Sequence, residues 1–215
     1  MQITRGTTDN SRNEILQKIR NIKQSQSYTV IDIGGIVNGW TNEIADLVVD
    51  KNAINSEKSM QLDICVYPEW DKLINHVLKN GKYDYAICTH TLEDVYDPFI
   101  ALEMLPKIAK AGIITMPSLQ AELSKVESND WIGFIHHRWM FDVVNGEMLI
   151  IPKLEFLSSM VKNLVKFNPA LAEIRYEWVD EIPYQIFMNN YLGPDANTVI
   201  SEYKKLINKF ITKQL

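Results

Sequence analysis

Cysteine is scarce in this 215-residue sequence, which contains only Cys65 and Cys88. Both lie in short apolar segments that we interpret as interior strand ends, so we expect reduced thiols rather than a disulfide framework. Long hydrophobic runs are also missing, because no window holds the roughly eighteen consecutive apolar residues of a transmembrane helix. Residues 1–21 are polar and lack the apolar core of a signal peptide. We therefore expect a cytoplasmic protein with no membrane span.

Positive charge is not concentrated anywhere along the chain. The sequence has 22 Lys and Arg against 27 Asp and Glu, a formal net charge of −5 and a pI near 5.4. A nucleic-acid partner is not expected, since no Lys/Arg cluster would neutralise a row of phosphates. Internal repeats and low-complexity tracts are absent too. With 46% hydrophobic residues, the chain can bury one sizeable core, so we expect a single domain over residues 1–215.

Short apolar runs alternate with amphipathic stretches along the chain. The expected strands are 29–33, 47–50, 61–65, 83–88, 113–116, 147–151 and 174–179, with a further apolar segment at 184–188. The expected helices are 11–25, a short one at 41–45, 70–78, 97–112, 154–167 and 197–211, with a loop at 118–131. This alternation predicts an α/β fold with a Rossmann-like, mostly parallel central sheet and helices on both faces. Ligands of such folds bind beyond the carboxyl ends of the strands.

Acidic residues recur where the first three expected strands end. Asp32 lies near the end of the first, just before two glycines that permit a tight turn and a close ligand approach. Asp50 ends the second strand and Asp63 lies in the third. Because parallel strands place their carboxyl ends at one edge, we expect the three acids to face one site. The structural alternatives are a plain strand and turn for Asp32, a surface acid for Asp50 and a helix N-cap for Asp63.

The glycine pattern after the first strand separates two classes of ligand. A dinucleotide requires Gly-x-Gly-x-x-Gly opening a full helix, so that a pyrophosphate can sit on the helix N-terminus. Here Gly34 and Gly35 are adjacent, the next two residues are Ile and Val, and Gly39 is displaced. The pattern argues against a nicotinamide dinucleotide.

Residues 25–117 together resemble the class I S-adenosylmethionine-dependent methyltransferases. The resemblance is carried by Val-Ile-Asp-Ile-Gly-Gly at 30–35, Leu-Val-Val-Asp at 47–50, Leu-Asp-Ile at 62–64, Tyr-Asp-Tyr-Ala-Ile-Cys-Thr-His-Thr-Leu-Glu-Asp-Val at 83–95, Asp97-Pro98 and Lys110-Ala-Gly-Ile-Ile114. It implies S-adenosyl-L-methionine as cofactor. The cofactor-binding residues that it implies are Asp32, Gly34, Gly35, Asp50, Asp63, Ile64, Thr89 and His90.

Within this resemblance, each acid has an expected role. Asp50 would accept hydrogen bonds from both ribose hydroxyls, because a carboxylate offers two acceptor oxygens. Asp63 would accept a hydrogen bond from the adenine amine, and the backbone N–H of the next residue would donate one to a ring nitrogen. His90 would lie at the reactive end of the cofactor and touch the acceptor, with a structural histidine as the alternative. We interpret Glu93 and Asp94 as structural acids at a helix start.

The chemically richest stretch outside the cofactor half is Gly-Phe-Ile-His-His-Arg-Trp at 133–139. Imidazoles, a guanidinium and an indole can remove a proton, orient oxygens and stack on a sugar. Similar segments occur in class I methyltransferases of surface-glycan sugars, so the resemblance implies a sugar acceptor. We expect His136 or His137 as the catalytic base, and His90, Arg138 and Trp139 as substrate-binding residues. A structural loop held by aromatic packing is the alternative.

These residues predict an O-methyltransferase acting on a sugar hydroxyl of a glycan or nucleotide-sugar. Residues 25–117 would bind the cofactor, and residues 118–215 would bind the acceptor and complete the sheet. The alternatives are a methyltransferase-like binding subunit without turnover and a methyltransferase of another small-molecule acceptor. No metal is expected, since His90, His136 and His137 show no recognisable ligand spacing.

Overall fold

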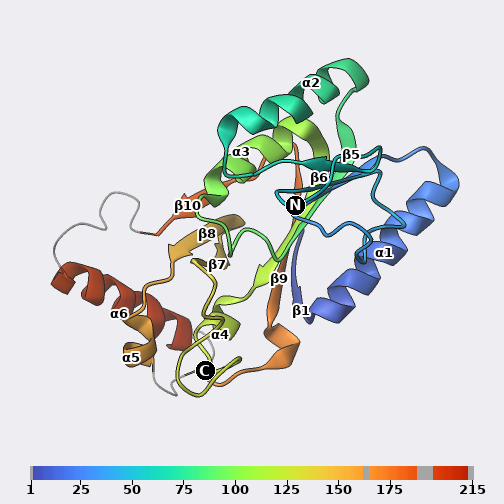
Figure 1. The fold of residues 1–215 in the computed structure, drawn as a ribbon. Coiled ribbons are helices and arrows are strands. Elements are labelled where there is room, and N and C mark those ends of the chain that lie inside the picture. The colour runs from blue at the N-terminus through green and yellow to red at the C-terminus, as the bar shows by residue number, and fades with distance from the viewer. Residues whose placement is uncertain (1, 162–164, 188–195, 213–215) are drawn as a thin grey trace.

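The computed structural model describes residues 2–161, 165–187 and 196–212 as two sheets with surrounding helices (Figure 1). The central sheet has the order β1-β9-β6-β5-β2-β3-β4, with β1 (Gln2–Gly6), β2 (Val30–Ile33), β3 (Leu47–Asp50), β4 (Ser59–Gln61), β5 (Tyr83–Thr89), β6 (Ala109–Pro117) and β9 (Glu173–Val179). A smaller sheet has the order β10-β8-β7, with β7 (Trp139–Val144), β8 (Glu147–Pro152) and β10 (Tyr184–Ile186). The helices are α1 (Thr8–Ser25), α2 (Asp71–Asn80), α3 (Pro98–Ile108), α4 (Leu119–Glu122), α5 (Leu157–Val161) and α6 (Ala196–Thr212), with short 3₁₀ turns at Tyr67–Trp70 and Pro169–Leu171.

The central sheet is mostly parallel, as predicted. Strands β2 to β6 pair in parallel, while β9 lies antiparallel to both β6 and β1. The carboxyl ends of the parallel strands therefore share one edge of the sheet. This edge is where residues at or just beyond the ends of β2, β3, β4 and β5 come together.

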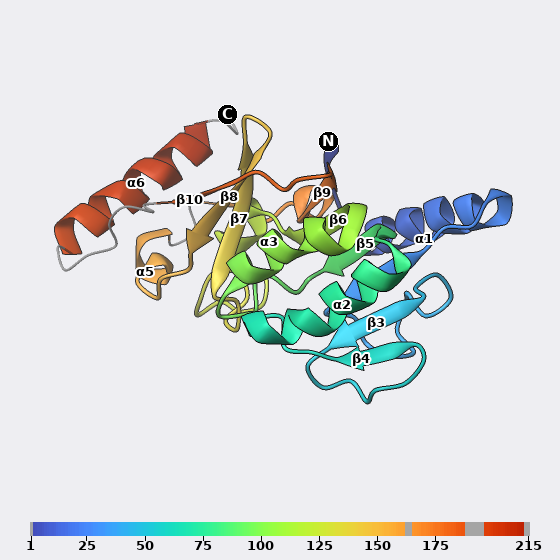
Figure 2. The ribbon, with the colours of Figure 1, turned by 90° about the horizontal axis from the view of Figure 1, so that it is seen from above.

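Helices cover both faces of the central sheet. Because side chains alternate along a strand, neighbouring residues of β2 enter different cores. Val30 packs in one cluster with Ile15 and Ile19 of α1, whereas Ile31 packs in another with Leu73 of α2 and Leu105 of α3. Figure 2 shows α2 and α3 side by side on one side of the sheet and α1 behind it. The prediction of helices on both faces is confirmed.

The second half of the described chain completes the molecule in two places. Strand β9 enters the central sheet between β1 and β6. The small sheet packs with α5 and α6 around a separate apolar cluster that includes Met140, Ile151 and Tyr203. Cys65 and Cys88 are both buried free thiols, as predicted. Among the described residues, no helix combines the length and hydrophobicity needed to cross a membrane.

Two predicted boundaries near the site are wrong. Strand β4 ends at Gln61, so Asp63 lies in the turn that follows; its carboxylate accepts the Cys65 N–H at 2.9 Å, and such a local bond competes with strand pairing. Helix α3 ends at Ile108 instead of continuing to Gly112, which belongs to β6. The glycine fits there because a Cβ would collide with the ring of Trp178 on β9.

Other predicted elements differ in extent. Residues 41–45 form turns rather than a short helix, and the predicted loop at 118–131 contains α4. Within the predicted helix 154–167, α5 covers only Leu157–Val161, and 162–164 lie outside the described residues. The segment near 184–188 is β10 in its described part, while residue 188 lies outside it. Strand β1 was not predicted, because an exposed edge strand carries no apolar pattern.

Candidate functional site

A cavity of about 400 Å³ lies at the carboxyl edge of the central sheet. This volume falls in the range typical of small-molecule sites. Six predicted site residues line it: Gly34, Asp50, Asp63, Ile64, His90 and Arg138. The other lining residues are Lys51, Leu62, Cys65, Thr91, Asp94, Val95 and Tyr96. Residues at or just beyond the carboxyl ends of the four parallel strands β2, β3, β4 and β5 thus converge on one space.

Gly34 forms the wall of the cavity beyond β2. Its φ of +79° lies in the left-handed region, and a Cβ there would collide with the side chain of Thr91. Its N–H donates to the Val49 carbonyl oxygen at 2.7 Å, which ties the glycine turn to β3. Backbone from β2 and from the segment after β5 therefore approach each other closely only because this residue has no side chain.

Asp32 lies beneath this turn and does not line the cavity. It is 2% exposed, and the hydroxyl of Thr41 donates to its Oδ2. Burial raises the pKa of Asp32 to about 6, although the Thr41 hydrogen bond acts in the opposite direction. Gly35 also lies outside the cavity lining, and a Cβ on it would collide with the Asp32 carboxylate. The pair fixes the loop that presents Gly34.

Asp50 and Asp63 are the two acids that the cavity shares with the predicted adenosyl site. Asp50 Oδ1 accepts the Asn52 N–H at 2.7 Å, and Asp63 Oδ1 accepts the Cys65 N–H at 2.9 Å. In each case the second carboxylate oxygen accepts no hydrogen bond from the described residues. The Ile64 N–H likewise has no partner within the described chain. Two acceptors and one donor therefore remain available at this wall.

Apolar side chains complete this part of the cavity. Leu62, Val95 and Tyr96 line it beside the two acids. The Tyr96 hydroxyl donates to the Cys65 carbonyl oxygen at 3.0 Å, which holds the ring against the turn after β4. An aromatic ring and aliphatic side chains beside free polar groups suit a flat heterocycle with polar edges.

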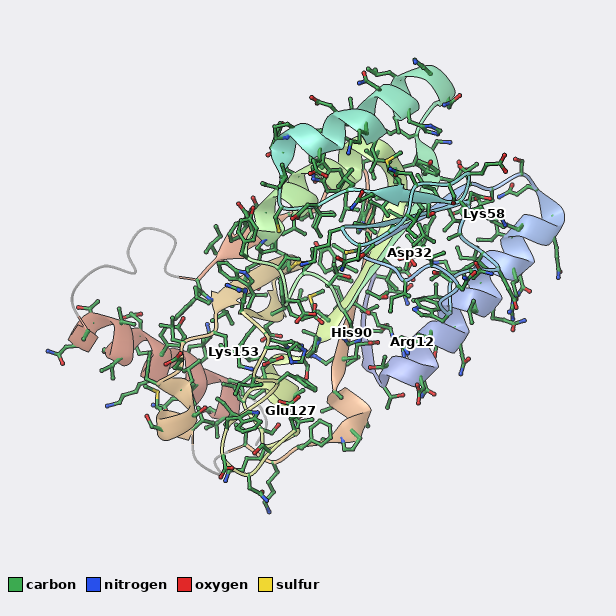
Figure 3. All side chains as sticks on the ribbon, viewed as in Figure 1. Arg12, Asp32, Lys58, His90, Glu127 and Lys153 are labelled. Atoms are coloured by element: carbon green, nitrogen blue, oxygen red, sulfur yellow. The ribbon has the colours of Figure 1, made fainter. Side chains whose placement is uncertain are left out.

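His90 follows β5, lines the cavity and contacts two buried carboxylates, those of Glu173 and Glu93, an arrangement here called the ionic clamp. Its Nε2 lies 2.6 Å from Glu173 and its Nδ1 lies 3.2 Å from Glu93, and both carboxylates are 1% exposed. Burial alone would lower the pKa of His90, but the hydrogen bonds and charges of Glu173 and Glu93 outweigh it and raise the pKa to about 9. Figure 3 shows this residue near the centre of the molecule. The two carboxylates therefore favour the protonated imidazole, which suits a structural clamp rather than a base.

The backbone and the surroundings of His90 are also specialised. Its φ of +49° is uncommon for a residue with a side chain and turns the imidazole toward β9. The Ser11 hydroxyl of α1 donates to the same Glu173 carboxylate. Thr89, the last residue of β5, pairs with Thr115 of β6 and does not line the cavity. The clamp therefore connects α1, β5 and β9 just below the site.

His137 is held by a second buried carboxylate. Its Nδ1 lies 2.6 Å from Glu122 Oε1, and Glu122 Oε2 accepts a hydrogen bond from Lys153 Nζ, also at 2.6 Å. Both the histidine and the glutamate side chains are buried, whereas His136 is exposed. This contact fixes the ring so that its Nε2 points away from Glu122. The neighbouring imidazoles thus differ in burial and in their carboxylate partners.

The loop before these histidines is shaped by two further contacts. Gly133 has a φ of +57°, and a Cβ on it would collide with Glu122. Glu127 accepts hydrogen bonds from the Ile135 N–H at 3.1 Å and the Trp131 indole N–H at 3.0 Å. These hydrogen bonds lower the pKa of Glu127. The loop therefore packs tightly onto α4 and presents its histidines on one side.

Asp94 connects the histidines to the cavity. It lines the cavity, and its Oδ1 lies 3.6 Å from both His136 Nε2 and His137 Nε2. The expectation that Glu93 and Asp94 begin a helix is wrong: both lie in a turn before α3. His136 and His137 do not line the cavity themselves, but they border it through Asp94 and Arg138.

The side chains of Arg138 and Trp139 lie in different surroundings. Arg138 lines the cavity, is exposed, and has no ion-pair partner among the described residues. The Trp139 indole N–H donates to the Val95 carbonyl oxygen at 3.0 Å, and its ring meets Phe99 edge-on at 5.2 Å. Trp139 lies outside the cavity lining and supports the wall that Val95 forms.

A larger cavity, of about 600 Å³, lies near the end of β6. Its lining includes Arg5, Gln120, Asp142 and Lys166, and none of the predicted site residues. Arg5 is already paired with Asp142 at 2.8 Å. The smaller cavity is the better candidate because two acids and one free backbone N–H lie there, next to the loop at 131–138 that carries His136 and His137, here called the histidine loop.

Several site residues were not predicted, and their sequence positions explain why. Glu122 and Glu173 meet their histidines only through the tertiary fold, and Tyr96 follows a turn without a motif. A search of protein-family models finds no match to the chain, and a search of curated proteins also finds none.

Proposed function

We propose that this protein is a Rossmann-like, S-adenosyl-L-methionine-dependent O-methyltransferase that acts on a sugar hydroxyl of a glycan or nucleotide-sugar. One observation carries the proposal. Gly34, Asp50, Asp63 and Ile64 line the same cavity at the carboxyl edge of the sheet, and the histidine loop borders its other side. Ligands of open α/β sheets bind at this edge.

The free polar groups of the cavity fit an adenosyl group. The second oxygen of Asp50 is available for a ribose hydroxyl, and that of Asp63 for the adenine amine. The Ile64 N–H would donate to a ring nitrogen, with Leu62 and Tyr96 beside the adenine faces. Gly34 lines the same cavity, so its backbone would lie beside the amino acid portion of the donor.

The histidine side of the cavity would hold the acceptor. Arg138 offers a guanidinium without an ion-pair partner to sugar or phosphate oxygens. When bound, S-adenosylmethionine supplies a methyl carbon on a sulfonium sulfur. A histidine nitrogen of the loop would take up the proton of the acceptor hydroxyl as its oxygen receives the methyl group, and the electron pair of the broken carbon–sulfur bond would stay on the sulfur of the donor. Holding the reactants in line supplies most of the rate enhancement.

His137 is the better placed of the two predicted bases. The buried Glu122 fixes its ring through Nδ1 and leaves Nε2 on the Asp94 side. His90 has a different part in the proposal, because its clamp with Glu173 and Glu93 keeps it protonated. It positions the end of β5 and does not take up the proton.

Calorimetry with S-adenosylmethionine tests the donor site. We expect saturable one-to-one binding and a dissociation constant raised roughly 10- to 100-fold in Asp50→Asn, because one charged hydrogen bond contributes about 1.5–3 kcal/mol. Asp180→Asn is the matched control, since it removes the same charge beyond the end of β9 and outside the cavity. Absence of binding to the unaltered protein would overturn the proposal.

Methyl transfer tests the acceptor site. Nucleotide-sugars and glycans are offered beside phenols and carboxylates, with radiolabelled donor. We expect transfer to sugars, and a loss of at least about 100-fold in His137→Ala with donor affinity kept. His76→Ala is the control, because His76 is an exposed histidine on α2. Full activity in His137→Ala would remove this residue from the reaction.

A further inference from the structure

Three polar side chains from two distant segments converge beside the cavity without hydrogen bonds to one another. Asp94 Oδ1 lies 3.6 Å from the Nε2 atoms of His136 and His137, which is too long for a hydrogen bond. All three ligand atoms lie within 4.8 Å of one another. We propose that Asp94, His136 and His137 bind a divalent first-row transition metal ion.

The spacing of these atoms fits a metal ion. Ligand atoms bound tetrahedrally at about 2.0–2.2 Å stand roughly 3.3–3.6 Å apart. The two Asp94 distances lie at the upper end of that range. The ring centroids of His136 and His137 lie 4.4 Å apart, and His136 is exposed, so ion binding would require its Nε2 to turn toward the ion.

The surroundings of His137 are those of a metal-binding histidine. Such histidines donate the second ring N–H to a carboxylate, which fixes the tautomer and aims the other nitrogen at the ion. Glu122 takes this part at 2.6 Å, and it is in turn held by Lys153 at 2.6 Å. Gly133 allows the loop to pack onto Glu122. The buried His137 is therefore already positioned to bind an ion.

The ligand set selects the class of ion. Two imidazoles and one carboxylate favour Zn²⁺, Co²⁺, Mn²⁺ or Fe²⁺ over Mg²⁺ and Ca²⁺, which prefer all-oxygen sites. Three protein ligands leave at least one position open, and Asp94 places that position at the cavity. With the ion bound, His137 would be a ligand and not the base: the ion would hold the acceptor oxygen and lower the pKa of its hydroxyl, whose proton would leave to solvent. This role rests on the proposed methyl transfer, but ion binding does not.

Cobalt titration of the metal-free, untagged protein tests the site directly. We expect one Co²⁺ per chain with visible d–d absorption, and a dissociation constant raised at least about 10-fold in Asp94→Asn and in His136→Ala. Both changes affect exposed side chains, so the variants are expected to fold. His76→Ala and Asp130→Asn are the matched controls, as exposed residues outside the group. No saturable binding, or binding unchanged in Asp94→Asn, would overturn the inference.

Donor binding and methyl transfer separate this inference from the proposed function. Cobalt binding without S-adenosylmethionine binding would leave the metal site standing and refute the methyltransferase. Full methyl transfer in the presence of a strong chelator would show that His137 acts as a base without the ion, and would overturn the role of the metal. Transfer that is lost on chelation and restored by Co²⁺ or Mn²⁺ supports both.

Discussion

Replacing His90 with asparagine should remove a pH-dependent part of the stability of the fold. Asparagine tolerates the left-handed backbone at this position, where φ is +49°, so the change acts on the side chain. Nε2 of the imidazolium contacts Glu173 and its Nδ1 contacts Glu93, and the Thr8 hydroxyl oxygen of α1 lies 3.4 Å from Nε2. Among the described residues, no other histidine contacts these buried carboxylates.

The size of the effect follows from the pKa. The folded protein raises the pKa of His90 to about 9, from 6.5 when unfolded. A raised pKa contributes stability that is fully present below the unfolded value and is lost as the pH rises through the folded value. The contribution is about 3 kcal/mol below pH 6.5, roughly 2.5 kcal/mol at pH 7 and close to zero at pH 10.

Urea unfolding followed by tryptophan fluorescence measures the difference. Between pH 7 and pH 10, the wild-type free energy of unfolding should fall by about 2.5 kcal/mol more than that of His90→Asn. Buried groups such as Cys88, whose thiol pKa is raised by burial, titrate in both proteins and cancel in the comparison. Parallel pH profiles, or an NMR titration midpoint of His90 near 6.5, would refute the ionic clamp.

Two other changes test the turn after β2. In urea unfolding, Gly34→Ala should destabilise the protein by roughly 1–3 kcal/mol more than Gly81→Ala. Both glycines have a positive φ, but only at Gly34 would the added Cβ meet a neighbouring side chain. Equal losses of unfolding free energy would show that backbone strain alone acts. Asp32→Asn should raise the urea midpoint at pH 8 and leave it nearly unchanged at pH 4. The raised pKa of Asp32, about 6, means that the charged carboxylate is unfavourable in the folded protein. A lowered midpoint at pH 8 would contradict this.

Local patterns carried most of the fold prediction. Strands β2, β3 and β5 and helices α1, α2 and α6 have strong periodicity, so their positions followed from the sequence. Boundaries failed where tertiary contacts decide them. Gly112 resembles a helix stop, but it is placed in β6 by pairing with Ala86 and by Trp178.

The candidate site likewise contains residues that local patterns predict and residues that only tertiary contacts bring together. Gly34, Asp50 and Asp63 follow strands, and the shared edge of a parallel sheet brings them to one cavity. The partners of the histidines could not be predicted in this way. Glu122 and Glu173 lie in other segments of the chain, and only the packing of α4 and β9 brings them to His137 and His90.

A crystal structure of the protein with S-adenosylhomocysteine, the demethylated donor, tests the central claim most directly. The account predicts density in the cavity of about 400 Å³, with the ribose at Asp50, the adenine at Asp63 and Ile64, and the sulfur facing Asp94 and Arg138. Density in the larger cavity, or a structure without bound ligand at saturating concentration, would contradict it.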